Sequence, residues 1–340
     1  MVRVRLKDVA DHAGVSVKTV SNVVNNWEYV TDATRERVQK ALDELGYRPN
    51  LSARSLRTGR TNLIALALPR LHEPYFAELA DCVVRAAEDH GLTVLISQTD
   101  GRREREQQVV SGFRPQFIDG LLFSPLALEW DDLEEIPGHP PVVLLGERLA
   151  AGGAADHVAV DNVAAAQRAT QHLVELGRKR IAVIGAPPSK TARTASLRLE
   201  GYKRALRKAR IRLDKQLLLP VNQLHRADGA AAMATLLDLA PPPDAVFCFN
   251  DLLALGALRT LQERGVAVPS EVAVIGFDDI EESRFCSPSL TTISPDKKAL
   301  AGLAVAALVQ RMSVAPDAAP QELHAGFELV ERESTMGRRA

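Results

Sequence analysis

The chain has 340 residues, of which 46% are hydrophobic and 25% are charged. This length fits two to three domains, and the composition excludes a disordered, collagen-like or disulfide-stapled chain. The net charge is only −1, but residues 1–60 carry +4 and the remainder carries −5. A basic head on an acidic body suggests a small module that faces a polyanion.

The cysteines and the N-terminus favour a protein of the cytoplasm. Cys82, Cys248 and Cys286 are isolated, with no CxxC pair, which favours buried reduced thiols over a zinc site or a disulfide framework. The opening residues MVRVRLKDVADHAG lack the apolar core of a signal peptide. No apolar run approaches the ~20 residues of a membrane span, so we expect no membrane contact.

The head predicts three short helices, at residues 6–13, 17–25 and 32–45. Gly14 follows the first helix, where a residue tolerant of positive φ is favoured, and Ser16 and Thr31 suit the N-caps of the next two. Each helix has one apolar face, made of Val9, Ala10 and Ala13, then Val20, Val23 and Val24, then Val38, Leu42 and Leu45.

The second helix turns polar side chains outward. Lys18 and Asn22 are four residues apart, so they share one face, beside Val17 and Ser21. Two helices joined by a short glycine-containing turn, the second with an exposed polar N-terminal end, form the helix-turn-helix signature. This pattern favours DNA binding over the alternative, a helical cap with a solvated face.

The segment YRPNLSARSLRTGR follows the head. Pro49 ends the third helix, and Asn50 can cap a short helix, LSARSLR. By composition alone, the same segment can be an ordinary flexible linker.

From Asn62 the chain alternates between strands and helices. The expected strands are LIALAL, TVLIS, DGLLFS and PVVLLG, and then RIAVIG, LLLPV, AVFCF and VAVIGF. Such alternation is typical of parallel sheets covered on both faces, and two runs of it predict two lobes with a cleft between them. We therefore expect an α/β protein in which a helix-turn-helix headpiece is joined to a body of two parallel, doubly wound sheets.

Ligands of open parallel sheets bind beyond the carboxyl ends of the strands, where several notable residues stand. An Arg198 guanidinium can clamp two hydroxyls, and Asp278 can accept hydrogen bonds from the same hydroxyls. Tyr75 and Phe76 can stack on a sugar or a base. The alternatives are a surface charge for Arg198, a helix cap for Asp278 and Asn250, and core packing for Phe76.

The motifs LKDVADHAGVSVKTVSNVVN, VTDATRERVQKALDELGYRPN and ARSL resemble the head and hinge of the LacI/GalR family of bacterial transcription regulators. The similarity continues through RLEGY, FNDLLALGAL, GVAVPSEVAVIGFDD and SPSLTTI, nearly to the end of the chain. The resemblance implies a head at 1–46, a hinge helix and linker at 47–61, and a periplasmic-binding-protein-like effector and dimerisation domain at 62–340. In this domain the chain crosses between lobes near residues 160, 292 and 322.

The resemblance also assigns roles to single residues. It places base readers in the recognition helix and in the hinge, where Leu56 is the minor-groove wedge: Val17, Lys18, Asn22, Ala53 and Leu56. It places phosphate contacts at Ser16, Thr19, Ser21, Asn25 and Thr34. It places effector contacts at Tyr75, Phe76, Thr194, Arg198, Asn250 and Asp278.

Three positions depart from the family pattern. Val17 offers a base only apolar contact, Leu224 stands about where relatives often have an aromatic residue, and Glu147 follows Gly146 where some relatives have the acidic residue first. The operator sequence and the effector therefore cannot be copied from a relative.

We expect a homodimeric repressor, rather than an activator, that binds a palindromic DNA operator under control of a small metabolite, most simply a sugar or sugar derivative. The ending ERESTMGRRA lacks the leucine-rich helix of tetrameric relatives. The alternatives are a solute-binding protein, which needs a signal peptide, and a cytoplasmic sugar-modifying enzyme. The stretch GAPPSKT lacks the second glycine and the spacing of a phosphate loop, and no GxSxG or HExxH occurs. No catalytic residue, cofactor or metal is expected.

Leu56→Ala should weaken binding to the operator much more than binding to random DNA. Alanine keeps helix propensity but removes the wedge that supports a bent operator, whereas random DNA is held by phosphate contacts. Affinities for both DNAs and the bend angle, measured at one salt concentration, check this. Equal losses on the two DNAs would mean that Leu56 is only linker packing.

Overall fold

The computed structural model describes residues 4–24, 27, 29–47, 60–112, 117–134, 136, 138–147, 155–187, 193–313 and 319–337. The chain forms two compact units, Met1–Thr61 and Asn62–Ala340, which are described separately. The expected hinge helix, with Ala53 and Leu56, lies outside the described residues, and so does Asn25.

The head contains α1 (Leu6–Ala13), α2 (Val17–Val24) and α3 (Asp32–Glu44). Gly14 ends α1 with φ +63°, as its position predicts. The core of the head is the expected apolar set with Ala41 added, except that Val24 and Leu45 are only half-buried. Thr31 precedes α3, but its hydroxyl donates to Thr34 Oγ1 (2.9 Å), so it does not form the expected side-chain cap.

The first lobe of the body is built on a six-stranded sheet in the order β11-β5-β4-β3-β1-β2, in which every pair is parallel. Its strands are β1 (Leu63–Leu68), β2 (Thr93–Gln98), β3 (Gly120–Phe123), β4 (Val142–Leu145), β5 (Asp156–Val160) and β11 (Glu322–Ala325). Its helices are α5 (Pro74–Glu88), α6 (Arg103–Gly112), α7 (Trp130–Glu134) and α13 (Lys297–Arg311).

The second lobe has a sheet in the order β12-β10-β9-β8-β6-β7. Its strands are β6 (Ile181–Ala186), β7 (Leu218–Pro220), β8 (Ala245–Cys248), β9 (Ala273–Phe277), β10 (Thr291–Pro295) and β12 (Phe327–Val330). Its helices are α8 (Asn162–Glu175), α9 (Arg193–Lys208), the short 3₁₀ helix η1 (Lys215–Leu217), α10 (Arg226–Leu237), α11 (Asp251–Glu263), α12 (Glu282–Phe285) and α14 (Glu333–Met336). The expected two-sheet α/β architecture is confirmed, with one addition: β12 pairs with β10 antiparallel.

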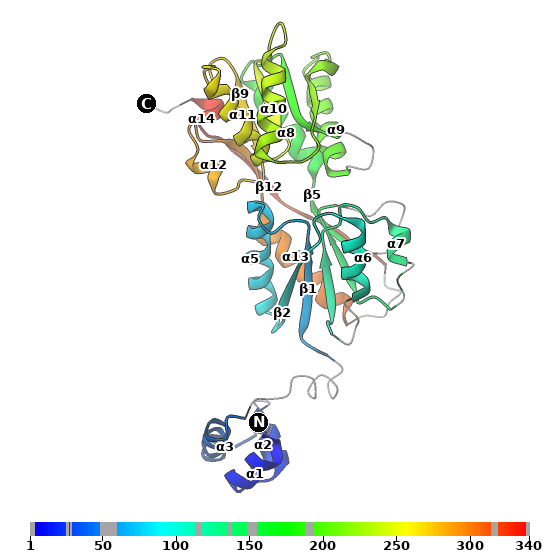
Figure 1. Ribbon diagram of the computed structural model, residues 1–340, viewed down its shortest axis with the longest axis vertical. Coiled ribbons are helices and arrows are strands. Elements are labelled where there is room, and N and C mark those ends of the chain that lie inside the picture. The colour runs from blue at the N-terminus through cyan, green and yellow to red at the C-terminus, as the bar shows by residue number, and fades with distance from the viewer. Residues whose placement is uncertain are drawn as a thin grey trace. The chain divides into compact units, whose positions relative to one another are not determined.

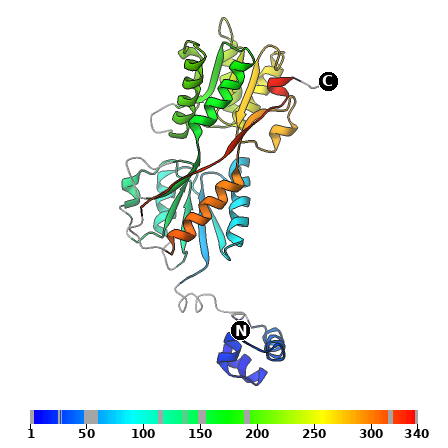
Figure 2. The same ribbon diagram turned by 180° about the vertical axis from the view of Figure 1, so that it is seen from behind.

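Three segments carry the chain between the two lobes, as Figures 1 and 2 show. Strand β5 is followed by α8 at Asp161, β10 by α13 at Asp296, and β11 by β12 at Gly326. The crossings were expected near 160, 292 and 322; residue 292 lies within β10, and residue 322 begins β11. Because the chain passes between the lobes three times, each lobe combines segments that are distant in the sequence.

Both faces of each sheet are buried, as the continuous apolar strands predict. In β1, Ile64 and Leu66 pack with the cluster that contains α5 and α13, whereas Ala65 and Ala67 pack with the cluster that contains α6 and α7. The edge strands β2, β7, β11 and β12 are the exceptions, because most of their residues are exposed or half-buried. No helix within the described residues has both the length and the apolar character needed to cross a membrane.

Helices α10 and α11 cross at backbone contact, and two glycines allow this. A Cβ atom on Gly256 would lie 1.9 Å from the Arg226 carbonyl oxygen, and one on Gly229 would lie 2.1 Å from the Leu253 carbonyl oxygen. Gly302 of α13 is the contrasting case, since a Cβ there would meet nothing within 4 Å. The first two glycines serve close packing, and the third does not.

Gly256→Ala should destabilise the body by about 1–3 kcal/mol or more, because the added methyl group forces the helices apart. Gly302→Ala is the matched control and should stabilise it by about 0.5–1 kcal/mol, the usual gain for alanine over glycine inside a helix. Thermal and urea unfolding of both variants measure this. A Gly256→Ala protein as stable as the wild type would contradict the close crossing.

Candidate functional site

The N-terminal end of α2 presents the residues predicted to read bases. Val17 is 44% exposed and Lys18 is exposed, whereas Asn22 is half-buried one turn further along the helix. The Ser16 Oγ accepts a hydrogen bond from the Thr19 backbone N–H (3.1 Å), which is the expected N-cap. An exposed helix start with a cation and an amide on one face is suited to the major groove of DNA.

The residues predicted to contact phosphates are hydroxyl-bearing and lie near the starts of α2 and α3. The Ser16 and Thr19 hydroxyls hydrogen-bond each other (2.8 Å), and the Thr34 hydroxyl accepts from Thr31. Ser21 is half-buried on α2. Hydroxyls and backbone N–H groups at helix starts are common phosphate contacts, so these positions are consistent with that role.

In the body, Arg198 of α9 lies where four elements of the second lobe meet. Its Nε donates to Asn162 Oδ1 (2.9 Å) and its Nη1 donates to the Phe249 carbonyl. Its guanidinium carbon lies 3.5 Å from the centre of the Phe277 ring. The start of α8 and the ends of β8 and β9 therefore hold this cation in place. Arg198 is thus not the free surface charge that was considered as the alternative.

Asp278 directly follows β9 and faces the same region. It is 8% exposed and has φ +116°, a conformation that costs energy in any residue other than glycine. Its neighbour Asp279 holds the turn, because its carboxylate accepts from Arg332 Nη2 (2.5 Å) and Ser294 Oγ (3.0 Å). Burial raises the pKa of Asp278 to about 8, although the Arg198 charge acts in the opposite direction.

Tyr75 and Phe76 open α5 in the first lobe and pack edge to face, with ring centres 5.3 Å apart. Burial raises the pKa of the Tyr75 hydroxyl, with the Asp278 charge acting in the same direction and the Arg198 charge opposing it. The Lys297 ammonium lies 5.9 Å from the Tyr75 ring centre. Tyr75, Arg198 and Asp278 therefore lie within electrostatic range of one another, although they come from two lobes.

Asn250 has partners within its own lobe, whereas Thr194 contacts a residue of the other lobe. The Asn250 Oδ1 caps α11 by accepting from the Leu253 N–H (2.9 Å), and its Nδ2 donates to the Leu224 carbonyl (2.9 Å). The Thr194 N–H donates to the Glu147 carboxylate (3.0 Å to Oε2). Asn250 is thus used as a cap, the alternative considered for it, and its amide also holds the segment that contains Leu224.

Several residues at the junction of the lobes escaped the sequence reasoning. Lys297 at the start of α13 pairs with Glu78 Oε2 (2.5 Å) and donates to the Asp279 carbonyl (3.0 Å). Glu78 also accepts from the Glu281 N–H (3.3 Å). Glu147 was singled out only as a departure from the family pattern. The signal for these residues in the sequence was a charged side chain next to a crossing between the lobes or next to the end of a strand.

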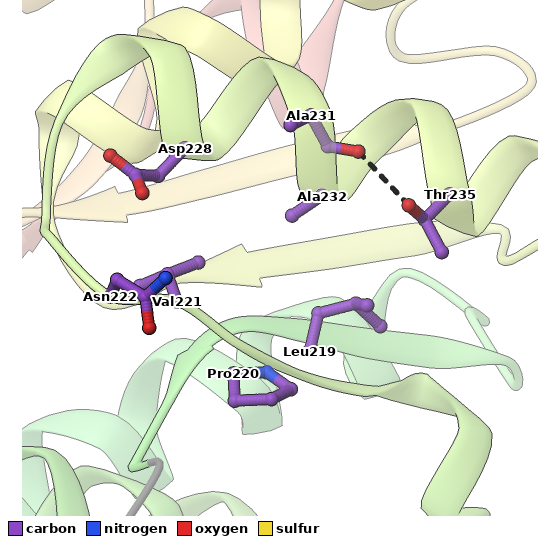
Figure 3. Close-up of a pocket in the computed structure, with 8 residues that line it drawn as sticks. All are labelled: Leu219, Pro220, Val221, Asn222, Asp228, Ala231, Ala232 and Thr235. Atoms are coloured by element: carbon purple, nitrogen blue, oxygen red, sulfur yellow. Dashed lines mark hydrogen bonds between the residues drawn. The ribbon is translucent and has the colours of Figure 1, made fainter.

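A hollow of about 320 Å³ lies between β7 and α10; Figure 3 shows the residues that line it. Its lining is mixed, with Asp228 and Asn222 among apolar side chains, and the Thr235 hydroxyl within it donates to the Ala231 carbonyl (3.1 Å). It contains none of the predicted effector contacts. We therefore place the candidate ligand site at Arg198 and Asp278.

Known proteins match both units of the chain. A family model described as bacterial regulatory proteins of the lacI family matches residues 5–50, and a periplasmic binding protein-like domain matches residues 170–335. The HTH-type transcriptional repressor CytR of Escherichia coli is 36% identical over 308 residues, which cover 90% of this chain and 89% of that protein.

Two solved structures cover almost the whole chain. The lac repressor dimer bound to operator and the anti-inducer ONPF has a TM-score of 0.85 at 28% identity, covering 98% of this chain and 99% of that one. The complex of the transcriptional regulator CelR with cellobiose has a TM-score of 0.73 at 32% identity, covering 98% and 100%.

Lys18→Ala should change the preferred DNA sequence, whereas Thr34→Ala should lower affinity for all sequences alike. A good base contact gives about 1–3 kcal/mol of discrimination and a phosphate contact gives none. Selection of sites from random DNA with each variant measures this. If the consensus is unchanged for both Lys18→Ala and Asn22→Ala, the reading surface lies elsewhere.

Proposed function

The chain belongs to the lacI family of bacterial regulatory proteins, and on that premise we propose that it represses transcription under control of a hydroxyl-rich ligand held between its lobes. The observation that carries this proposal is that half-buried Arg198 of α9 and buried Asp278 at the end of β9 lie within electrostatic range of each other and of Tyr75 in the first lobe. Ligands of open parallel sheets bind at such strand ends.

The chemistry of this pair favours a carbohydrate or another ligand with neighbouring hydroxyls, such as a nucleoside. A guanidinium presents several N–H donors in a fixed plane, and a carboxylate accepts from hydroxyls. The rings of Phe277 and Tyr75 add apolar surface for a sugar ring or a base. The similarity to the cellobiose complex of CelR supports this class.

On the DNA side, we assign α2 as the recognition helix, with Val17, Lys18 and Asn22 toward the bases. The phosphates of the DNA backbone are contacted by Ser16, Thr19, Ser21 and Thr34. Asn25, Ala53 and Leu56 keep the roles that the family resemblance implies. The similarity to CytR, which is a repressor, supports repression over activation.

Two exposed apolar surfaces favour a homodimer. Edge strand β2 exposes Leu95 (39%) and Ile96 (44%), and Phe285 in α12 is 78% exposed. An exposed edge strand and a bare aromatic ring are features that a second copy commonly covers. Two heads related by a two-fold axis would read a palindromic operator, in the cytoplasm where bacterial DNA lies.

No reaction is assigned to the cleft. Asp251 is buried with a pKa raised to about 7 by burial, but it accepts from Thr292 (2.6 Å), Ser283 (2.7 Å) and the Ile280 N–H (3.1 Å). These bonds tie α11 to the turns around it, which is a structural role. The similarity to CytR, a transcriptional repressor, supports a regulator over a sugar-modifying enzyme.

The experiment that tests the proposal screens monosaccharides, disaccharides including cellobiose, and nucleosides for thermal stabilisation of the full chain. A ligand at 100 times its Kd should add about 2.7 kcal/mol of stability. Operator affinity is then measured with and without each stabilising compound. Stabilising compounds that all leave operator affinity unchanged would contradict the proposed control.

Arg198→Ala and Asp278→Asn should each weaken ligand binding and leave operator binding intact when ligand is absent. Removing one partner of a charge-assisted hydrogen bond costs about 1.5–3 kcal/mol, or roughly ten- to 150-fold in affinity. Arg204→Ala is the matched control, since Arg204 lies on the same helix and pairs with Glu200 at the surface. Calorimetry measures ligand affinity, and normal affinity in both cleft variants would show that the ligand binds elsewhere.

Ligand affinity should also rise with pH and level off above about pH 8. The pKa of Asp278 is raised to about 8, so below this pH the carboxyl is mostly protonated. If the ligand hydroxyls require the ionised carboxylate, affinity changes by up to about tenfold per pH unit below the pKa. Calorimetry between pH 6 and pH 9 should show this slope for the wild type and none for Asp278→Asn. A flat profile for the wild type would mean that the ionised carboxylate is not what the ligand selects.

A further inference from the structure

Three potential metal ligands from the two lobes meet at the junction beside the cleft. His72 and Glu73 lie in the turn between β1 and α5 of the first lobe, and His225 is the N-cap residue of α10 in the second. Each offers a ligand atom, and these atoms all lie within 4.8 Å of one another. The imidazole rings are 6.0 Å apart between centres, and His225 Nδ1 is 3.9 Å from Glu73 Oε1.

The donor set matches the preferences of zinc. Two imidazole nitrogens and one carboxylate oxygen are a common three-ligand zinc set, in which the fourth position of a tetrahedron is left for water or another ligand. Zinc bonds of about 2.0–2.2 Å place ligand atoms about 3.3 Å apart. The observed spacing is within about 1.5 Å of that value, a change that side-chain rotation can supply at the exposed His72.

The environment of Glu73 also suits a cation. The carboxylate is buried, and Arg70 supports it from the first lobe (3.1 Å between Nη1 and Oε1). A buried carboxylate needs a compensating positive charge, which Arg70 supplies here and a zinc ion would supply at higher charge density. An ion pair explains why Arg70 and Glu73 lie together. It does not explain why two histidines from different lobes lie beside the same carboxylate.

We propose that His72, Glu73 and His225 form a zinc site that joins the two lobes. His225 directly follows Leu224, whose carbonyl is held by Asn250, so the second-lobe ligand is tied to the end of β8. Because its ligands come from both lobes, zinc favours the arrangement in which the lobes are close together. A cation that binds one arrangement better shifts the population toward it, whatever ligand occupies the cleft.

The sequence reasoning found no metal site because the ligands are remote in the chain. The His72-Glu73 pair precedes Pro74, which breaks helical ligand spacing, and His225 comes from the other lobe. Only the fold brings the three together.

The test uses the full chain without a histidine tag, stripped of metal with a chelator and titrated with zinc by calorimetry. The wild type should bind one zinc ion per chain. His72→Ala and His225→Ala should each weaken zinc binding by about 100-fold or more, because each removes one of three ligands. His90→Ala is the matched control, since His90 is exposed just beyond the far end of α5.

Non-additivity distinguishes one shared site from two separate ones. The double variant should bind zinc no more than a few-fold more weakly than either single variant, because one lost ligand already opens the site. Cobalt in place of zinc should give the visible absorption of a tetrahedral ion in the wild type and in His90→Ala only. A wild type that binds no zinc, or a His225→Ala protein that binds it normally, would overturn the proposal.

Hydrogen exchange tests whether the site joins the lobes. Zinc should protect residues 71–73 of the first lobe and residues 222–225 of the second together. Either single histidine variant should lose zinc-dependent protection in both segments, while thermal unfolding of the metal-free variants confirms that each is folded. Zinc-dependent protection of residues 71–73 that survives in His225→Ala would show a site confined to one lobe, and the proposal would fail.

Discussion

The arrangement of the candidate ligand site depends on the half-buried guanidinium of Arg198. Burial lowers the pKa of this group, and the protein offsets the cost with the Asn162 amide, the Phe249 carbonyl and the face of Phe277. These partners stand at the start of α8 and at the ends of β8 and β9, so a single side chain aligns three elements of the second lobe. The carboxyl group of Asp278 lies within electrostatic range of this cation and can share a ligand with it.

Several contacts between the lobes are polar. Glu147 reaches Thr194, Glu78 reaches Glu281, and Lys297 reaches the Asp279 carbonyl. Partly exposed polar contacts of this type typically contribute about 0–1 kcal/mol each. A ligand that touches both lobes can therefore shift their arrangement, because at these polar contacts it competes with small energies.

The sequence predicted most of the fold and part of the site. The strong 3.6-residue pattern of the head and the apolar strands of the body were enough for α1, α2, α3 and the eight strands that were quoted, since burial of both sheet faces leaves continuous apolar runs. Strands β5, β10, β11 and β12 were not expected, because polar residues interrupt their short apolar runs. Strand β12 also pairs antiparallel, at an edge of its sheet. Arg198 and Asp278 were expected from strand-end logic and the family resemblance, but the positive φ of Asp278 could not be read from an aspartate. Contacts such as Lys297 with Glu78, or His225 with Glu73, join residues whose separation in sequence carries no local signal.

The most direct measurement of the central claim is a thermodynamic cycle of ligand and operator binding on one protein. If the ligand held by Arg198 and Asp278 controls the head, it changes operator affinity by some factor, and saturating operator must change ligand affinity by the same factor. We predict equal factors that differ from one for the wild type, and a factor of one for operator binding by Arg198→Ala at the same ligand concentration. A ligand that binds the wild-type cleft but leaves operator affinity unchanged, with a factor of one in both directions, would contradict the account.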